Sequence, residues 1–405
     1  MKIRAITGFI APQHGVDNAA MGSLPKLVSE AGDQLGSKGF EVQTMRLATT
    51  PFPQWVKPLT QSRVVEAAVG AEKAATDAGF GFIALGPALP EIPESFHFVP
   101  EILKETKNAF LGGIAATRKA GIVLDALKAC AEIIQKVSTL EANGFGNLRF
   151  ATLANVPPGS PFFPAAYHKG SKPAFAFATQ AADLAVLAFE SAGSIADGRR
   201  SLTASIEENG KRLAQIAEDL SRKYDVTFLG IDFSLAPFPE KRDSLGAAFE
   251  RMGIHAAGEH GSLAAAAILT QAIDSADFPR TGFNGLLLPP LEDSVLAKRA
   301  AEAKLTISDL LMYSAVCGTG LDTIPLPGNA STGQLGALLL DVCALALRLD
   351  KPLTARLMPI PGKQAGDETS FDFPYFANSR VLELKSNGLN GLLATSETLS
   401  INRRK

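Results

Sequence analysis

The chain has few of the side chains that usually mark a metal or redox site. Its 405 residues include only three cysteines (Cys130, Cys317 and Cys343), five histidines and one tryptophan. An odd number of cysteines at no metal-ligand spacing argues against a disulfide framework and against a zinc cluster. Free thiols in this number fit a reducing compartment, so we expect a cytoplasmic protein.

An excess of charge of one sign and long hydrophobic runs are also lacking. The formal net charge is -2 and the sequence pI is about 6.3, whereas a nucleic-acid surface needs a basic stripe. The longest apolar run, Leu263 to Leu269, is far shorter than the roughly 20 residues that cross a bilayer. The first residues lead directly into a strand-like run without the pattern of a signal peptide. These observations exclude nucleic acid and membrane as expected partners.

The common catalytic motifs are absent as well. No G-x-G-x-x-G follows the first strand, and no G-x-x-x-x-G-K-[ST] occurs, so dinucleotide and P-loop binding have no support. G-x-S-x-G and H-E-x-x-H are missing too. The familiar nucleotide-binding enzymes, serine hydrolases and zinc proteases are thereby excluded, but enzymes in general are not.

What the chain does contain is a regular alternation of strand and helix patterns. Strands are predicted at 2–9, 40–47, 81–86, 109–115, 150–154, 174–178, 225–233, 285–288 and 353–359. Helices are predicted at 21–39, 61–79, 101–108, 121–137, 195–224, 244–252, 263–273, 294–303, 307–316 and 332–349. This alternation predicts an α/β protein with mostly parallel strands. Since no linker of biased composition divides it, we expect one large domain over residues 1–405.

The segment from Tyr313 to Gly328 is the most distinctive stretch of the chain. It places Cys317 in an apolar run, then glycines on both sides of Thr319, then Asp322 and a proline stop. Glycine allows close approach of the backbone, so a buried loop of this kind can carry chemistry. A small core residue is the alternative role for Cys317.

Two histidines stand in unusual surroundings. His260 lies between glycines at the start of the predicted helix 263–273, where a neutral imidazole could act as a base or bind a metal, or could simply be a polar turn residue. His168 follows a rigid stretch rich in proline and aromatic residues, so it either lines a pocket or packs as an amphipathic ring.

Charged residues at strand ends complete the set of candidates. Asp232 ends a predicted strand, where parallel α/β folds open into a ligand crevice, and Ser234 follows it; a turn cap is the alternative for Asp232. Arg356 lies in an apolar strand that leads into a Pro/Gly turn with Lys363. A guanidinium in such a strand needs a carboxylate or phosphate partner, so Arg356 is either half of a structural ion pair or a substrate clamp.

Six segments, taken in order, resemble one known family. They are the N-terminal KIRAIT (2–7), GIDFSLAPFP (230–239), Asp243-Ser244, GEHG (258–261), AVCGTGLDTIP (315–325) and the stretch 356–367. Together they resemble the bacterial and archaeal domain of unknown function 711 family, which is placed in the pyruvate formate-lyase-like superfamily. The resemblance runs nearly end to end and is most specific from about residue 228 to residue 367.

The resemblance implies a ten-stranded α/β barrel made of two five-stranded parallel sheets, with a finger loop in its interior. On this basis the Cys317 segment is expected to be the finger loop. Asp232, His260, Asp322 and His168 are expected to face the interior. The family name brings no defined reaction.

The chain departs from the resemblance in two ways. Glycyl radical enzymes need an Arg-Val-x-Gly-aromatic motif, and the only candidate here, Ser379-Arg-Val-Leu-Glu, has no glycine in place. We therefore expect no radical chemistry. The first half (1–225) also differs more from the family than the second half (226–405), because Pro157-Pro-Gly-Ser-Pro161 stands where the family has Glu-Asp-Asn-Pro.

Two kinds of function follow. The first is a non-radical enzyme acting on a small polar metabolite, with Cys317 as nucleophile or acid, His260 or His168 as base, Asp322 as orienting group, and Arg356, Ser234 and Lys363 on the substrate. In one version Asp232, Asp322 and His260 bind a divalent cation, and their oxygen-rich set suits Mg, Mn or Ca. The second is a small-molecule-binding or regulatory protein that has lost catalysis. In both cases we expect a homo-oligomer whose copy number the sequence does not fix.

Overall fold

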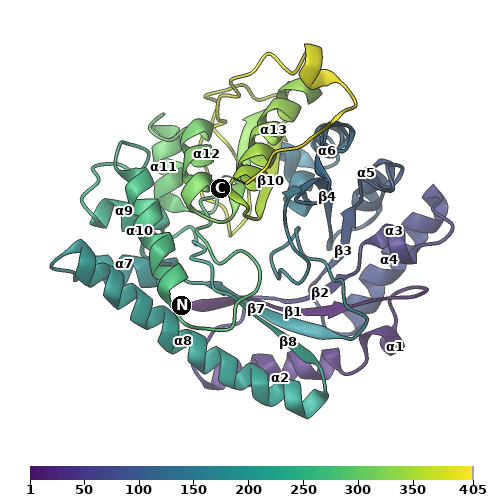
Figure 1. Cartoon of the computed structure of the whole chain (residues 1–405), viewed down its shortest axis with the longest axis horizontal. Helices are drawn as coiled ribbons and strands as arrows, with labels where there is room; N and C mark the ends of the chain where they lie inside the picture. The colour runs from purple at the N-terminus through teal and green to yellow at the C-terminus, as the bar shows by residue number, and fades with distance from the viewer. Residues whose placement is uncertain (404–405) are drawn as a thin grey trace.

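The computed structural model describes residues 1–403 and consists of one large sheet with helices around it (Figure 1). The strands are β1 (Lys2–Ile10), β2 (Met45–Thr49), β3 (Phe82–Ala88), β4 (Ala109–Thr117), β5 (Gly121–Val123), β6 (Phe150–Ala154), β7 (Ala174–Gln180), β8 (Thr227–Asp232), β9 (Gly320–Pro327), β10 (Leu353–Ile360) and β11 (Thr398–Leu399). The helices are α1 (Asn18–Met21), α2 (Leu24–Ser37), α3 (Phe52–Trp55), α4 (Gln61–Asp77), α5 (Ser95–Glu105), α6 (Leu124–Val137), α7 (Ala182–Glu190), α8 (Ile195–Tyr224), α9 (Leu245–Arg251), α10 (Ser262–Ser275), α11 (Ser294–Ala301), α12 (Ile307–Val316) and α13 (Thr332–Leu349).

The sheet is built around five neighbouring parallel strands. β1, β2, β3, β4 and β6 pair in that order, each parallel to the next. β7 joins β1 antiparallel and carries β8 parallel to itself, while β10 joins β6 antiparallel and carries β9. The full order is β8-β7-β1-β2-β3-β4-β6-β10-β9, so the two flanking pairs run opposite to the central five.

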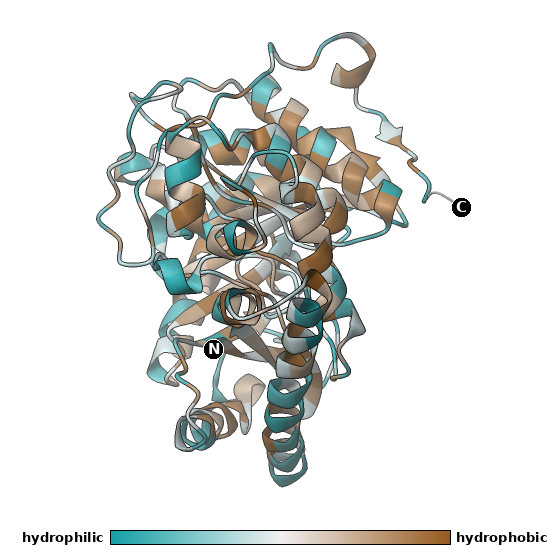
Figure 2. Ribbon diagram, turned by 90° about the vertical axis from the view of Figure 1, so that its left-hand side faces the viewer, coloured by the Kyte–Doolittle hydropathy of each residue, from teal (hydrophilic) through white to brown (hydrophobic). Residues whose placement is uncertain are grey.

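Helices cover one face of this sheet. In Figure 1, α2 and α8 lie below β1, β7 and β8, α4 to α6 lie on the right, and α12 and α13 lie above. The longest helix, α8, follows the expected pattern, with Leu202, Ile206, Leu213 and Leu220 buried at helical spacing. Its outward side is hydrophilic, and Figure 2 shows this long helix as a mostly teal ribbon with brown along one side. The apolar stripe therefore fixes α8 against the sheet.

The opposite, inner face of the sheet is covered by a loop. Alanines at inner positions of β2, β3 and β7 leave room there, and Phe162, Phe163 and Ala166 of the β6–β7 connection pack against the strands in two small clusters. The connection spans residues 155–173 and is called the inner loop below. Its entry is tied to β1, since the Thr7 hydroxyl donates to the carbonyl of Pro161 at 3.4 Å.

Most predicted elements occur in the structure. The predicted ranges 150–154, 195–224, 307–316 and 332–349 are found with the same bounds, and the mixed α/β class with mostly parallel pairing is confirmed. The short helix α7 was missed, and the predicted strand 285–288 is reduced to a single bridge between Leu235 and Leu286.

The prediction for the Cys317 segment needs correction. Helix α12 continues to Val316, Cys317 is its C-terminal cap residue, and strand β9 begins at Gly320. The segment is therefore a helix end followed by a strand, and the loop on the inner face is residues 155–173. The glycines around Thr319 mark the helix–strand junction, where Gly320 has a φ of 91° that favours glycine.

One helix among residues 1–403, α13, is long and apolar enough to cross a membrane by length and composition alone. Its side chains Leu335, Leu339 and Val342 are buried in the cluster between the helices and the sheet. A core helix of a large protein has the same properties.

Candidate functional site

Three arginines point from the strands toward the inner face. Arg4 lies on β1, Arg46 on β2 and Arg356 on β10. Each alternates with apolar neighbours that pack on the helix side, such as Ile3 and Leu47. Because side chains alternate across a strand, an apolar outer face forces these guanidinium groups inward.

Two carboxylates hold two of the arginines. The Nε of Arg356 donates to Asp322 Oδ1 at 2.5 Å, and its Nη2 donates to Glu292 Oε1 at 3.0 Å. The other carboxylate oxygen of Glu292 accepts from Arg4 Nη2 at 2.9 Å. We call these five residues (Arg4, Arg46, Arg356, Glu292 and Asp322) the inner arginine cluster. Glu292 thus bridges β1 and β10, which are distant in the order of the sheet.

The inner loop places two aromatic rings under the arginines. The guanidinium carbons of Arg4 and Arg356 lie 5.9 and 5.7 Å from the centre of the Phe162 ring. The guanidinium carbon of Arg46 lies 5.1 Å from the centre of the Phe163 ring. Cation–π attraction of this kind favours a charged group over an aromatic face. The loop therefore forms a floor that orients the arginines.

Arg46 differs from the other two arginines because it lacks a carboxylate partner. Among residues 1–403 its side chain makes one hydrogen bond, from Nε to Thr44 Oγ1 at 2.8 Å, and no ion pair. Burial, with the positive charges of Arg4 and Arg356, lowers the pKa of Arg46 to about 9. Three guanidinium groups and two carboxylates leave one positive charge unmatched, and a bound anion would compensate it.

The pKa of Arg356, which is buried in an ion pair with Asp322, shifts in the opposite direction to that of Arg46. Burial works against the charge of Arg356, but Asp322 and Glu292 outweigh it and raise the pKa of Arg356. Two polar atoms of the cluster, Arg4 Nη1 and Asp322 Oδ2, are buried without a hydrogen-bond partner within the described chain. A buried polar atom without a partner carries a cost that a ligand group could remove. The arrangement can therefore accept an acid group and a further donor.

The structure thus brings together two of the residues selected from the sequence, Asp322 and Arg356. They form the ion pair that the sequence left open as either structural or substrate-binding. Both are almost completely buried, with the side chains of Asp322 and Arg356 1% and 5% exposed, so the pair has the character of a structural ion pair.

Asp232 and Ser234 form a second polar group with a structural role. Asp232 accepts from the backbone N–H of Phe283 and of Asn284, each at 3.0 Å, and from Ser234 Oγ at 2.5 Å. Burial raises the pKa of Asp232, while these donors oppose the shift. The carboxylate therefore caps the turn at Gly282, which is the alternative that the sequence left open for it.

Cys317 lies on the helix side of the sheet. It is 1% exposed and belongs to the cluster between helices and sheet, so it does not face the inner arginine cluster. Burial raises the pKa of the Cys317 thiol, although Lys351 nearby opposes the shift. A nucleophilic cysteine needs a lowered pKa and access, and here the thiol has neither. The expectation that Cys317 sits on an interior finger loop was wrong.

The two candidate histidines differ in burial. His260 is exposed in the turn before α10, so the expectation that it faces the interior was wrong. His168 is 5% exposed near the end of the inner loop, where its Nε2–H donates to the carbonyl of Lys172 at 2.9 Å. Burial lowers the pKa of His168, and its ring lies 5.9 Å from that of Phe9. It is a packed amphipathic ring.

The remaining predicted ligands do not assemble. No group of three or more His, Cys, Asp or Glu side chains that could hold a metal ion occurs in the part of the chain that the structure describes. Asp232, Asp322 and His260 are therefore not gathered into one centre. Lys363 lies partly buried in the turn after β10, and its backbone is bonded to Gly328 and Ile360.

Sequence reasoning missed Arg4, Arg46 and Glu292. The signal for the two arginines was present, since each is a charged residue between two apolar residues of a strand, as Arg356 is. Glu292 gave no such signal, because it lies in a turn and its pairing depends on the tertiary fold.

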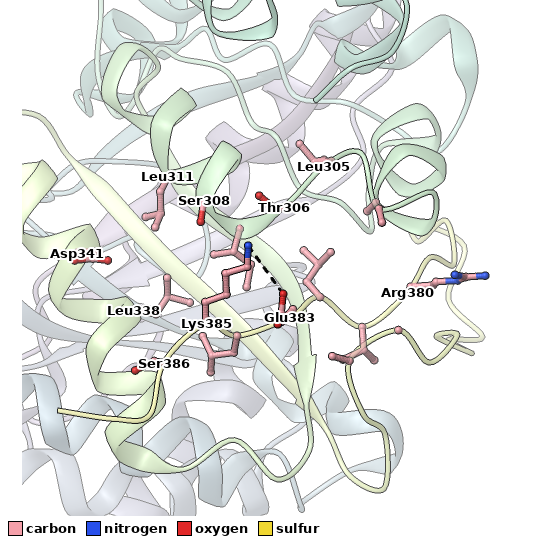
Figure 3. A pocket seen from close by; sticks show the side chains of 18 of the residues that line it. Leu305, Thr306, Ser308, Leu311, Leu338, Asp341, Arg380, Glu383, Lys385 and Ser386 are labelled. Carbon is pink, nitrogen blue, oxygen red and sulfur yellow. Dashed lines mark ion pairs between the residues drawn. The ribbon is translucent and has the colours of Figure 1, made fainter. Parts of the chain in front are cut away.

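A separate cavity of about 300 Å³ lies outside the sheet, between the α11–α12 turn, α13 and the segment 380–386. Figure 3 shows Leu305, Leu311 and Leu338 around it, and Lys385 directed toward Glu383. These two charges face each other at 4.0 Å and both side chains are mostly exposed. The cavity thus has a mixed lining of leucines and exposed charges and no unmatched buried charge, which makes it a weaker candidate than the inner arginine cluster.

Comparison with known proteins identifies relatives along most of the chain. The model of the family described as "Uncharacterised ACR (DUF711)" matches residues 1–379. A UPF0210 protein of Pyrobaculum aerophilum is 32% identical over 360 residues, which cover 84% of this chain and 79% of that protein. A UPF0210 protein of Methanococcoides burtonii is 28% identical over 373 residues, covering 87% and 82%. The chain therefore belongs to this uncharacterised family, DUF711.

Proposed function

We propose that the protein binds a small organic anion at the inner arginine cluster. The observation that carries this proposal is Arg46, a guanidinium group stacked on Phe163 without a carboxylate partner among residues 1–403. Arg4 and Arg46 are partly exposed, whereas Arg356 and Asp322 are buried, so the two outer arginines are the ones that a ligand reaches. A planar guanidinium group suits a carboxylate because it donates two parallel hydrogen bonds.

The closed barrel implied by the family resemblance is part of the proposal. Residues 280–286 support it, because Arg280 bridges in parallel to Ile231 of β8 and Leu286 bridges in parallel to Leu235, three residues after β8. The Thr319 hydroxyl next to β9 donates to the carbonyl of Leu286, so the same segment also touches the other end of the sheet. In such a barrel the inner face becomes an interior, and the inner loop is its finger loop.

An enzyme is the second candidate, and one observation favours it. Asp322 Oδ1 is paired with Arg356, but its Oδ2 is buried without a partner. A carboxylate held in this way could take or give a proton if a ligand reached it. This version needs no thiol and no radical, and it uses Glu292 or Asp322 as the acid–base group.

Native mass spectrometry combined with a thermal-shift panel tests the proposal. Acetate, malonate, benzoate and inorganic phosphate are added separately to the wild type and to Arg46→Met, which keeps length and apolar packing. We expect at least one organic anion to raise the midpoint of the wild type and to leave that of Arg46→Met unchanged. The same response of both proteins to every anion would refute the site.

A further experiment distinguishes the two candidate functions, a binding protein and an enzyme. The small molecule released from the purified protein is incubated with fresh protein and followed by mass spectrometry. A binding protein leaves its mass unchanged, whereas an enzyme converts it, and Asp322→Asn then abolishes the conversion while Arg46-dependent binding persists.

A further inference from the structure

Beside the inner arginine cluster lies a group of partly exposed aromatic rings. Phe373 and Tyr375 come from the segment after β10, and Phe238 comes from the segment after β8. The ring centres of Phe238 and Tyr375 are 5.7 Å apart at 87°, and those of Phe373 and Tyr375 are 5.2 Å apart. Tyr375 is 41% exposed, so one side of the group faces solvent. We call these three residues the aromatic rim.

The fold anchors the aromatic rim next to the arginines. The backbone N–H of Ala377 donates to the carbonyl of Leu291 at 2.6 Å, one residue from Glu292. Phe371 and Phe376 pack against Met358 and Ile360, which follow Arg356 on β10. The rim also lies against β1 two residues before Arg4, because the Nζ of Lys2 is 5.2 Å from the centre of the Phe238 ring.

The charge of the site limits what can bind. One positive charge is unmatched, and Glu292 and Asp322 lie within the same cluster. A ligand with a single negative charge compensates Arg46, whereas a second negative charge would meet these carboxylates. The charge balance thus favours a monoanion over a dicarboxylate or a phosphate.

The aromatic side chains around the arginines indicate the kind of apolar group that the ligand carries. The Phe163 ring of the inner loop lies against Arg46, and the aromatic rim lies against β1 next to Arg4. Aromatic walls on both sides favour a flat apolar group through stacking and edge contacts. An aliphatic acid as small as acetate has no ring to stack on these aromatic side chains.

From these observations we propose that the ligand is an aromatic monocarboxylate whose acid group pairs with Arg46 and whose ring packs on Tyr375 and Phe238. The inference rests on the proposed function and specifies its ligand class. Tyr375 then determines specificity, because it contacts the ring and not the acid group.

Isothermal titration with defined probes tests the ligand class. Benzoate, acetate and malonate are titrated into the full-length wild type and into Tyr375→Leu, which keeps an apolar side chain without an aromatic face. Because Tyr375 is exposed, this substitution is compatible with folding, which circular dichroism verifies. We expect benzoate to bind the wild type at least tenfold more tightly than acetate or malonate, and Tyr375→Leu to remove most of that preference.

The outcomes distinguish the two proposals. Equal affinity for benzoate and acetate, or an equal loss of both in Tyr375→Leu, overturns the aromatic ligand class while Arg46-dependent binding of an anion still stands. Binding that is unaffected by Arg46→Met, or no binding of any probe, overturns the anion site and the ligand class with it.

Discussion

Removing one partner of the buried ion pair between Arg356 and Asp322 should destabilise the protein strongly, because the other charge then stays buried without compensation. Replacing Arg356 with Met preserves length and packing but leaves Asp322 as a charge that is only 1% exposed and has lost its partner at 2.5 Å. Breaking one side of a buried pair costs about 3–5 kcal/mol. For 405 residues, an unfolding entropy of about 0.85 kcal/mol per kelvin converts this into a fall in melting temperature of about 4–6 °C.

Differential scanning calorimetry measures this fall, and Arg63→Met is the matched control. Arg63 pairs with Glu66 at 2.9 Å on α4, but both side chains are exposed, so its loss should leave the melting temperature unchanged. The double variant Arg356→Met/Asp322→Asn should recover part of the loss, because it removes the uncompensated carboxylate. A melting temperature of Arg356→Met equal to that of Arg63→Met would refute the reasoning.

Three further predictions concern residues outside the arginine cluster. Asp293 accepts hydrogen bonds from Ser244 Oγ and from four backbone N–H groups at the starts of α9 and α11. Asp293→Ala should therefore lower the free energy of unfolding, measured by calorimetry, by on the order of 3 kcal/mol. A smaller loss than that of an exposed aspartate replaced by alanine would contradict this. Burial lowers the pKa of His168, so the folded state binds fewer protons than the unfolded state and stability is lost as pH falls below about 6.5. The melting temperature of His168→Gln should therefore drop less between pH 7.5 and pH 5 than that of the wild type. An equal drop in both proteins would show that His168 does not cause the loss of stability. All three cysteines are buried, so a thiol reagent should label the native protein slowly and the denatured protein at three sites. Cys317→Ala should leave anion binding unchanged. Fast labelling of Cys317 in the native protein would contradict its assignment as a buried core residue.

Much of the fold could be predicted because local patterns determined it. The heptad-like spacing of Leu202, Ile206, Leu213 and Leu220 defined α8 to the residue, and the apolar run 150–154 defined β6. Strand β9 was not predicted, because its glycine and its prolines, Pro325 and Pro327, are typical of loops. Its strand geometry comes from pairing with β10, which is a tertiary contact.

The candidate site was harder to predict for a related reason. Arg356 was recognised because a charge in an apolar strand needs a partner, and Asp322 proved to be that partner. The sequence did not indicate that Cys317 would face the helices, since a helix end and a loop tip share its composition. The pairing of Glu292 with arginines from two distant strands depends on sheet order, which no local pattern encodes.

The position of a bound anion tests the central claim most directly. Crystals of the wild type soaked in 4-bromobenzoate, and separately in selenate, give anomalous signals from bromine and selenium that locate each anion. The account predicts a peak beside the guanidinium group of Arg46, on the side of Tyr375, with at least one of the two probes. Peaks only in the cavity between α12 and α13, or no peak beside Arg46 with either probe, would contradict it.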